Sequence, residues 1–327
     1  MERIKPFILE PVLMEKIWGG RRLETLLGKK LPPGKYGESW EVSTHRNGIN
    51  RIATGDFKGT YLDRLIASDP EKLLGEGILS KGIRDLPILV KFIDATNMLS
   101  VQVHPDDEYA MFHENDRGKT EAWYILHADE DAQLIYGLKE GTTREKLRKS
   151  IEEGRMEEHL RYVSIERGDV LFVPAGTVHA ILGGVVLLEV QESSDSTYRL
   201  YDWNRVGFNG KPRPLHIEKA LDVIDYDFHN EVCKPSRIKK HYGYFSTLVS
   251  CPYFTINRYE FDRDISINSS GENHFEAVTV IDGSCEVPFE DGYLELKRGD
   301  SLYIPPDCVD LTITPRGDSE LIEIFVD

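Results

Sequence analysis

The stretch GDVLFVPAGTVH, from Gly168 to His179, recurs downstream as GDSLYIPPDCVD, from Gly299 to Asp310. Each copy follows a strand-like segment that begins with a glutamate, EAWYIL at Glu121 and EAVTVI at Glu276. The first copy is longer, and its surplus corresponds to a helix-like segment from Leu138 to Arg161. An internal repeat of this kind predicts that one β unit occurs twice, with a helical insertion in the first copy.

Most of the chain consists of short segments rich in β-branched and aromatic residues, separated by glycine and proline turns. Many short strands with such turns favour an all-β sandwich or barrel. We therefore predict a mostly β fold of two jelly-roll barrels or sandwiches. The expected strands are residues 86–94, 121–128, 169–175 and 185–191, followed by 253–261, 276–283, 293–300, 301–307 and 320–327.

Two regions have helical patterns, one near residues 60–75 and one near 142–160. In the first, Thr60 is expected to cap one helix, and Asp69-Pro70 to open another that ends at Gly75. In the second, Thr142 and Glu145 resemble a capping box. The repeat divides the chain into a catalytic unit, residues 1–235, and a degenerate unit without metal, residues 236–327.

The net charge of −16 argues against nucleic acid or an anionic membrane as a partner, since both require a basic face. No run approaches the roughly 20 apolar residues of a membrane span, and charges interrupt the N-terminus too often for a signal peptide. The four cysteines contain no C-x-x-C pair, which favours a reducing cytoplasm. We expect a monomer or homodimer.

Four residues form a candidate metal site: Gln102, His104, Glu121 and His179. Gln102 and His104 lie two residues apart, which on a strand places them on the same face. Glu121 opens the next strand, and His179 closes the Gly-Pro-Gly turn. Imidazole and carboxylate together suit zinc, iron, nickel or manganese, and an incomplete protein ligand set leaves a position for substrate.

Each of these residues alone has a simpler structural explanation, such as a solvent-facing carboxylate at a strand start. Their joint occurrence within the repeat favours the metal site. The second copy has Asp310 where the first has His179, so only the first unit is expected to bind metal.

Several motifs in residues 14–205 resemble those of type I phosphomannose isomerases, a family of zinc enzymes with two cupin units. The matching strings are KIWGG (16–20), YGESWEVSTH (36–45), LSVQVHPDD (99–107), KTEAWYIL (119–126), PAGTVHAI (174–181) and QESSDSTYRLYDWNR (191–205). The resemblance implies one zinc ion, or another divalent metal, on the four residues above. It also implies a phosphorylated hexose as substrate, interconverted between mannose 6-phosphate and fructose 6-phosphate through an enediol or enediolate.

The resemblance further implies a catalytic Arg199, with Lys119, Ser100 and Glu189 at the site. A family lysine six residues after the arginine is Arg205 here, which the resemblance implies as a substrate-binding residue and which keeps the charge but changes the geometry. The family pattern H-K-P-E is replaced by Gly118-Lys119-Thr120-Glu121, so the role of that histidine cannot be transferred. A common aromatic two residues after the last histidine is Ile181.

The chemistry of these residue types fits an isomerase. Arg199 offers a planar fork for phosphate or an oxyanion, although it could instead pair with Asp195 or Asp202. Lys119 would share the face of Glu121, two residues away. Glu189 is the expected base if burial raises its pKa, and the alternative is a carboxylate paired with a cation.

Trp18 and Glu38 are further candidates for substrate contacts, although a buried aromatic and a satisfied core carboxylate would explain them nearly as well. Two other functions remain open from the residues alone. Two histidines and a carboxylate also suit an iron-dependent cupin oxygenase. A sugar-phosphate-binding cupin without enzymatic activity is the second alternative.

Overall fold

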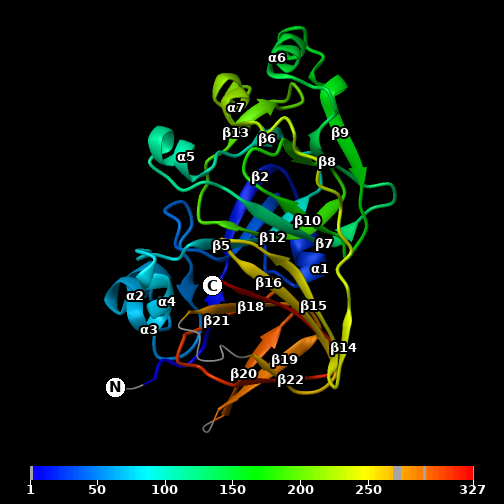
Figure 1. Ribbon diagram of the computed structural model, residues 1–327. Helices are drawn as coiled ribbons and strands as arrows, with labels where there is room; N and C mark the ends of the chain where they lie inside the picture. Colours follow the sequence, from blue (N-terminus) through cyan, green and yellow to red (C-terminus); the bar gives the residue numbers. More distant parts are fainter. Residues whose placement is uncertain (1–2, 268–273, 290–291, 327) are drawn as a thin grey trace.

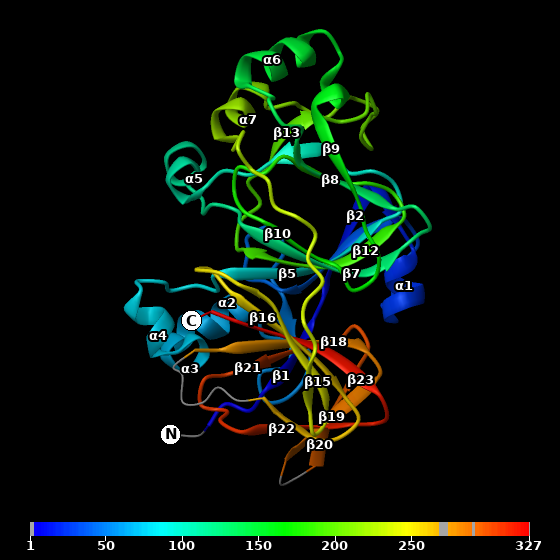
Figure 2. The ribbon, with the colours of Figure 1, turned by 45° about the vertical axis from the view of Figure 1, so that its right-hand side comes forward.

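The computed structural model describes residues 3–267, 274–289 and 292–326, and antiparallel sheets dominate it (Figures 1 and 2). Two sheets make up the first unit. The larger has the strand order β10-β7-β12-β5-β3-β2, with β2 Val12–Gly20, β3 Tyr36–Val42, β5 Ile88–Ala95, β7 Glu121–Ala128, β10 Val170–Val173 and β12 Val185–Glu192. The smaller has the order β13-β6-β11-β8-β9, with β6 Val101–Val103, β8 Gln133–Leu138, β9 Leu160–Ser164, β11 His179–Ile181 and β13 Tyr198–Tyr201.

Two further sheets make up the second unit. The larger has the order β14-β15-β16-β23-β18-β21-β1-β4, with β1 Phe7–Glu10, β4 Arg51–Ile52, β14 Ile238–Lys240, β15 Gly243–Ser250, β16 Thr255–Phe261, β18 Glu276–Asp282, β21 Ser301–Ile304 and β23 Ser319–Phe325. The smaller has the order β17-β22-β19-β20, with β17 Ile265–Ile267, β19 Ser284–Phe289, β20 Gly292–Lys297 and β22 Leu311–Pro315. The prediction of a mostly β fold is confirmed.

The helices are short and lie outside the sheets (Figure 1). They are α1 Arg22–Leu27, α2 Leu62–Ser68, α3 Pro70–Leu74, α4 Glu76–Ser80, α5 Asp107–Glu114, α6 Arg144–Glu152, the 3₁₀ helix η1 Met156–His159 and α7 Ile217–Val223. Both predicted helical regions are present, and α6 and η1 lie between β8 and β9, where the repeat predicts an insertion.

Two of the predicted caps are wrong by one residue. The residue before the first helix is Tyr61, whose side chain forms no capping hydrogen bond. Thr60 lies one position too early to be the cap. The α6 cap is Thr143, whose hydroxyl accepts from the Lys146 amide at 3.4 Å, while Thr142 donates to the Lys139 carbonyl. The Asp69 cap of α3 is confirmed, since its carboxylate accepts from the Lys72 amide.

The repeat is visible in the strand registers. In the first unit Trp123 lies opposite Glu189, which lies opposite Lys91 on the far side. In the second unit Val278 lies opposite Glu323, which lies opposite Asn257. Three pairs of residues are therefore equivalent: Glu121 and Glu276, Glu189 and Glu323, and Lys91 and Asn257.

The N-terminal strand crosses from one unit to the other. Phe7 pairs with Tyr303 and Ile8 with Leu302, so β1 extends the large sheet of the second unit. The rings of Phe7 and Phe275 stack on Tyr303, with centroids 5.2 and 5.4 Å apart, in a core continuous with the first unit. The division at residue 235 stays a prediction, and the sheets show that residues 7–10 belong structurally with the C-terminal half.

A buried ion pair connects the same two parts. Lys29 Nζ lies 2.7 Å from Glu41 Oε2 on β3 and also donates to the Gly299 carbonyl that precedes β21. Both side chains are less than a tenth exposed. Because an unpaired charge is costly inside a protein, each member depends on the other.

Replacing Lys29 by methionine is expected to lower the free energy of unfolding by about 3–5 kcal/mol, because Glu41 is then left buried without its cation. The double variant Lys29→Met/Glu41→Gln should recover most of that loss, since it removes the uncompensated charge as well. Urea denaturation of the three proteins measures both effects. Equal stability of Lys29→Met and the wild type would contradict this account.

Candidate active site

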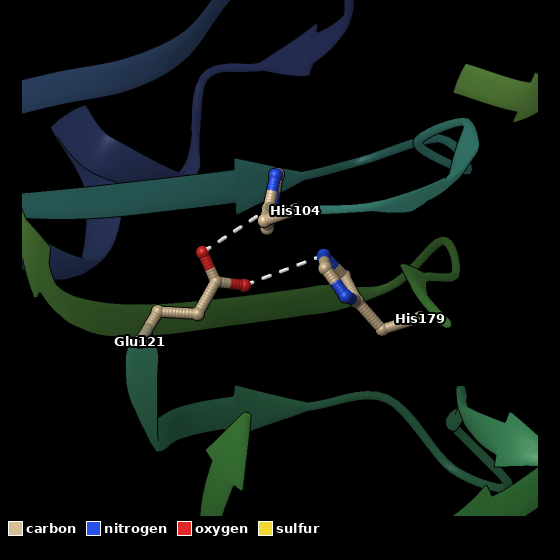
Figure 3. Close-up of side chains that lie close together, drawn as sticks. All are labelled: His104, Glu121 and His179. Atoms are coloured by element: carbon tan, nitrogen blue, oxygen red, sulfur yellow. Dashed lines mark ion pairs between the residues drawn. The ribbon is translucent and has the colours of Figure 1, made fainter. Parts of the chain in front are cut away.

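Two neighbouring strands of the smaller sheet, β6 and β11, and one strand of the larger sheet, β7, bring the predicted ligands together. Gln102 lies on β6 and His104 directly follows it, while Glu121 opens β7 and His179 opens β11. His179 pairs in register with Gln102, which fixes these two side chains beside each other. Figure 3 shows the imidazoles of His104 and His179 and the carboxylate of Glu121 directed toward one another.

The donor atoms converge closely. Glu121 places Oε2 3.6 Å from His104 Nε2 and Oε1 3.3 Å from His179 Nε2 (Figure 3). The Gln102 amide reaches His179 Nε2 at 3.2 Å. One ligand atom from each of His104, Glu121 and His179 lies within 4.8 Å of the others, and all three residues are buried. These residues form a His-Glu-His group that could bind a metal ion.

The outer ring nitrogens of both histidines are held by backbone carbonyls. His104 Nδ1 donates to Ser196 O at 2.9 Å, and His179 Nδ1 donates to Thr177 O at 3.0 Å. These contacts fix the ring orientation and leave the lone pair of each Nε2 directed toward the site, the usual arrangement of a metal-binding histidine. Burial, with the nearby Lys119 charge, lowers the pKa of His179 to about 3 and that of His104 well below its usual value.

Glu121 also fits a bound cation. Its Oε1 is buried and accepts no hydrogen bond from any residue that the structure describes, although a carboxylate has lone pairs for several. Burial raises the pKa of Glu121 to about 7, against the opposing charge of Lys119. Lys119 Nζ contacts Glu121 Oε2 and lies 2.8 Å from His104 Nε2, so its ammonium lies among the same donors. Two neutral imidazoles and a carboxylate suit zinc and related divalent ions.

A cavity of about 320 Å³ opens beside this group. Gln102 and Lys119 belong to its wall, so the two histidines and Glu121 that they contact lie directly behind them. Its lining consists of Lys16, Trp18, Glu38, Lys91, Ile93, Leu99, Ser100, Gln102, Lys119, Trp123, Ile181, Glu189, Asp195, Thr197, Arg199 and Arg213. The structure thus brings seven predicted residues other than the three buried ligands to one cavity: Gln102, Lys119, Ser100, Arg199, Glu189, Trp18 and Glu38.

Arg199 is connected to the metal-binding group through Ser100. Its Nε donates to Ser100 Oγ at 3.2 Å, and Ser100 Oγ lies 3.3 Å from Gln102 Oε1. Its Nη1 donates to the Pro214 carbonyl. Within the described residues Arg199 forms no ion pair, so neither Asp195 nor Asp202 is its structural partner.

Glu189 differs from the prediction. Its Oε1 lies 3.0 Å from Lys91 Nζ, and its Oε2 accepts from Trp123 Nε1 at 3.0 Å. Burial alone would raise the pKa of Glu189, but the charges of Lys91 and Lys119 outweigh burial and lower it. The expected rise in pKa is therefore wrong, and the alternative of a carboxylate paired with a cation describes this residue, with Lys91 as the cation.

Of the remaining two candidates, Glu38 lines the cavity and Arg205 does not. Glu38 accepts from Trp40 Nε1 at 2.8 Å and pairs with Lys16 at 2.9 Å; burial raises its pKa, but these contacts and Lys91 lower it to about 2. Glu38 is therefore an ionised member of the cavity wall. Arg205, in contrast, is not among the lining residues, because its guanidinium is bound to Asp202 and to the Met98 carbonyl.

The sequence reasoning missed three cations of the cavity: Lys16, Lys91 and Arg213. Lys91 could have been found from the sequence, since it is the one charged residue in the otherwise apolar run ILVKFI. A cation inside such a strand must meet a buried carboxylate. Arg213 lies in a loop between Pro212 and Pro214, and its spacing from Arg199 carried no periodic pattern.

Replacing His179 by alanine is expected to reduce bound zinc to below about 0.1 ion per chain, because one imidazole and the partner of Glu121 are lost. Elemental analysis after dialysis measures the stoichiometry. His127→Ala is the matched control, since that partly exposed histidine lies on β7, the strand of Glu121, and pairs with Asp129 instead. Equal zinc content in His179→Ala and His127→Ala would exclude His179 as a ligand.

Among the described residues, no helix is long and apolar enough to cross a membrane.

Comparisons with known proteins agree with this geometry. The family description "Phosphomannose isomerase type I, catalytic domain" matches residues 7–119, and "Mannose-6-phosphate isomerase, cupin domain" matches residues 245–326. The chain is 38% identical over 306 residues to the mannose-6-phosphate isomerase of Streptococcus mutans, covering 92% of both chains. It is also 38% identical over 307 residues to mannose-6-phosphate isomerase ManA of Bacillus subtilis, covering 92% of this chain and 93% of that protein.

The solved structures give the same result. The crystal structure of a mannose 6-phosphate isomerase from Bacillus subtilis superposes with a TM-score of 0.89 at 34% identity, covering 98% of this chain and 99% of that chain. A structure described as that of a mannosephosphate isomerase from Archaeoglobus fulgidus shares the fold at 22% identity, with a TM-score of 0.77 and complete coverage of both chains. The chain belongs to the type I phosphomannose isomerase family.

Proposed function

We propose that this protein is a metal-dependent aldose–ketose isomerase that interconverts mannose 6-phosphate and fructose 6-phosphate. The observation that carries the proposal is a cavity with a wall rich in cations, and the His-Glu-His group lies directly behind that wall. Relatives that this chain covers almost completely are named for this activity. The names of these relatives favour an isomerase over an oxygenase or a sugar-phosphate-binding protein.

The proposed metal is one zinc ion per chain, held by His104, Glu121 and His179, with Gln102 as the fourth ligand. When bound, such an ion supplies a Lewis acid beside the sugar carbonyl. Lys119 is suited to stabilise negative charge that develops on the sugar oxygens, because its ammonium already contacts Glu121 and lies 2.8 Å from His104.

The rest of the wall would hold the substrate. Arg199 and Ser100 are placed to donate to the phosphate, since Arg199 has no carboxylate partner among the described residues and lies against Ser100. Glu38, ionised and held by Lys16 and Trp40, offers acceptors for sugar hydroxyl groups. We propose that Glu189 holds Lys91 in place, since both of its oxygens already accept hydrogen bonds.

The zinc-loaded protein is expected to convert mannose 6-phosphate to fructose 6-phosphate, and chelation should abolish the conversion until zinc is restored. A coupled assay that detects glucose 6-phosphate formed from the product by an auxiliary isomerase measures the rate. The iron-loaded protein should consume no oxygen in the presence of sugar phosphates. Tight binding of mannose 6-phosphate without turnover in any metal form would identify a binding protein and contradict the proposal.

A further inference from the structure

Two arginines of one loop meet at a single buried carboxylate beside the cavity. Arg205 Nε donates to Asp202 Oδ1 at 2.9 Å, and Arg213 Nε donates to Asp202 Oδ2 at 2.7 Å. Arg213 also donates from its Nη2 to Oδ1, so it binds Asp202 through two parallel hydrogen bonds. Asp202 itself is 5% exposed. This bidentate contact fixes the plane and direction of the Arg213 guanidinium.

The two arginines face different surroundings. Arg213 lines the cavity, whereas Arg205 is not among the lining residues and directs its Nη1 to the Met98 carbonyl. Arg213 also adjoins Arg199, because the Arg199 guanidinium donates at 2.8 Å to the carbonyl of Pro214, the next residue. Of the five N–H groups of Arg213, Asp202 accepts those on Nε and one on Nη2. Among the described residues the Nη1 group donates to no partner, so it can bind a ligand.

The charges at this end of the cavity are not balanced. Glu38 is paired with Lys16 and Glu189 with Lys91, so neither carboxylate neutralises an arginine. Asp202 accepts from Arg205 and Arg213, and Asp195 also lines the cavity, so these two carboxylates and the three arginines Arg199, Arg205 and Arg213 leave an excess of one positive charge. A chain with a net charge of −16 that keeps such an excess in one half-buried place is suited to an anionic ligand.

We propose that Arg213 binds the phosphate of the substrate together with Arg199, and that Asp202 is a positioning residue that presents Arg213 to the cavity. The inference rests on the proposed function and deepens it. It assigns the second phosphate-binding cation to Arg213 rather than to Arg205, the residue to which the sequence resemblance pointed. Discrimination between a phosphorylated sugar and the free sugar then depends on two guanidinium groups, that of Arg199 on β13 and that of Arg213 in the loop that follows this strand.

The test uses glucitol 6-phosphate, which has no carbonyl group and cannot isomerise, and glucitol as its neutral counterpart. Calorimetric titration of the zinc-loaded protein measures binding of each. Arg213→Met is expected to raise the Kd of glucitol 6-phosphate by about 10- to 100-fold, because a desolvated charge-assisted contact is lost. Binding of glucitol should not change. In turnover, KM for mannose 6-phosphate should rise by a similar factor with kcat within about threefold.

Lys211→Met is the matched control, since it removes the same charge from an exposed position two residues away in the same loop. It should leave the Kd of glucitol 6-phosphate unchanged. Arg213→Lys keeps the charge but not the fork, so its Kd should lie between those of the wild type and Arg213→Met. Asp202→Asn should also weaken binding, with the Arg213 side chain intact but no longer fixed.

The binding measurement is independent of turnover. If the wild type binds glucitol 6-phosphate and Arg213→Met does not, while no protein isomerises mannose 6-phosphate, the assignment of Arg213 holds and the proposed reaction fails. If the wild type turns over mannose 6-phosphate and Arg213→Met binds glucitol 6-phosphate as tightly as Lys211→Met does, Arg213 is not a phosphate ligand. A thermal melt of each variant verifies that it is folded, and Arg213→Lys, which keeps a cation for Asp202, carries the test if Arg213→Met does not fold.

Discussion

The carboxylate of Glu121 is the constraint around which the first unit is organised. It is completely buried at the start of β7, where an ionised group is costly unless cations or donors surround it. Lys119, two residues before Glu121, provides a cation, and the imidazoles of His104 and His179 provide nitrogen donors. Since Glu121 opens a strand of one sheet while His104 and His179 belong to β6 and its neighbour β11 in the other, the group depends on how the two sheets pack against each other.

The second unit shows what the same framework becomes without this constraint. Glu276 and Glu323 occupy the positions of Glu121 and Glu189, but Asn257 replaces Lys91. Asn257 Nδ2 donates to Glu323 Oε2 at 2.8 Å, and burial raises the pKa of Glu323, which favours its neutral form. Replacing the cation by an amide therefore changes a charged network into a hydrogen-bonded one. The contrast supports the view that the charged network of the first unit serves chemistry rather than folding.

Much of this could be predicted from the sequence because the relevant patterns are local. The repeat of Gly168–His179 predicted the doubled β unit. The two-residue spacing of Gln102 and His104 predicted that their side chains lie on the same face of a strand. Glu189 could not be judged in this way, since its pKa depends on Lys91, which lies far away in sequence and meets it only through strand pairing. Arg205 and Arg213 have the same partner, so only the path of their loop decides which of them faces the cavity.

The central claim is that Gln102, His104, Glu121 and His179 hold one divalent metal ion. X-ray absorption at the zinc edge, recorded on the zinc-loaded protein, tests it most directly. The account predicts a first shell of nitrogen and oxygen at about 2.0–2.1 Å with imidazole scattering from two histidines and no sulfur. A shell with sulfur at about 2.3 Å, or one without imidazole scattering, would contradict it.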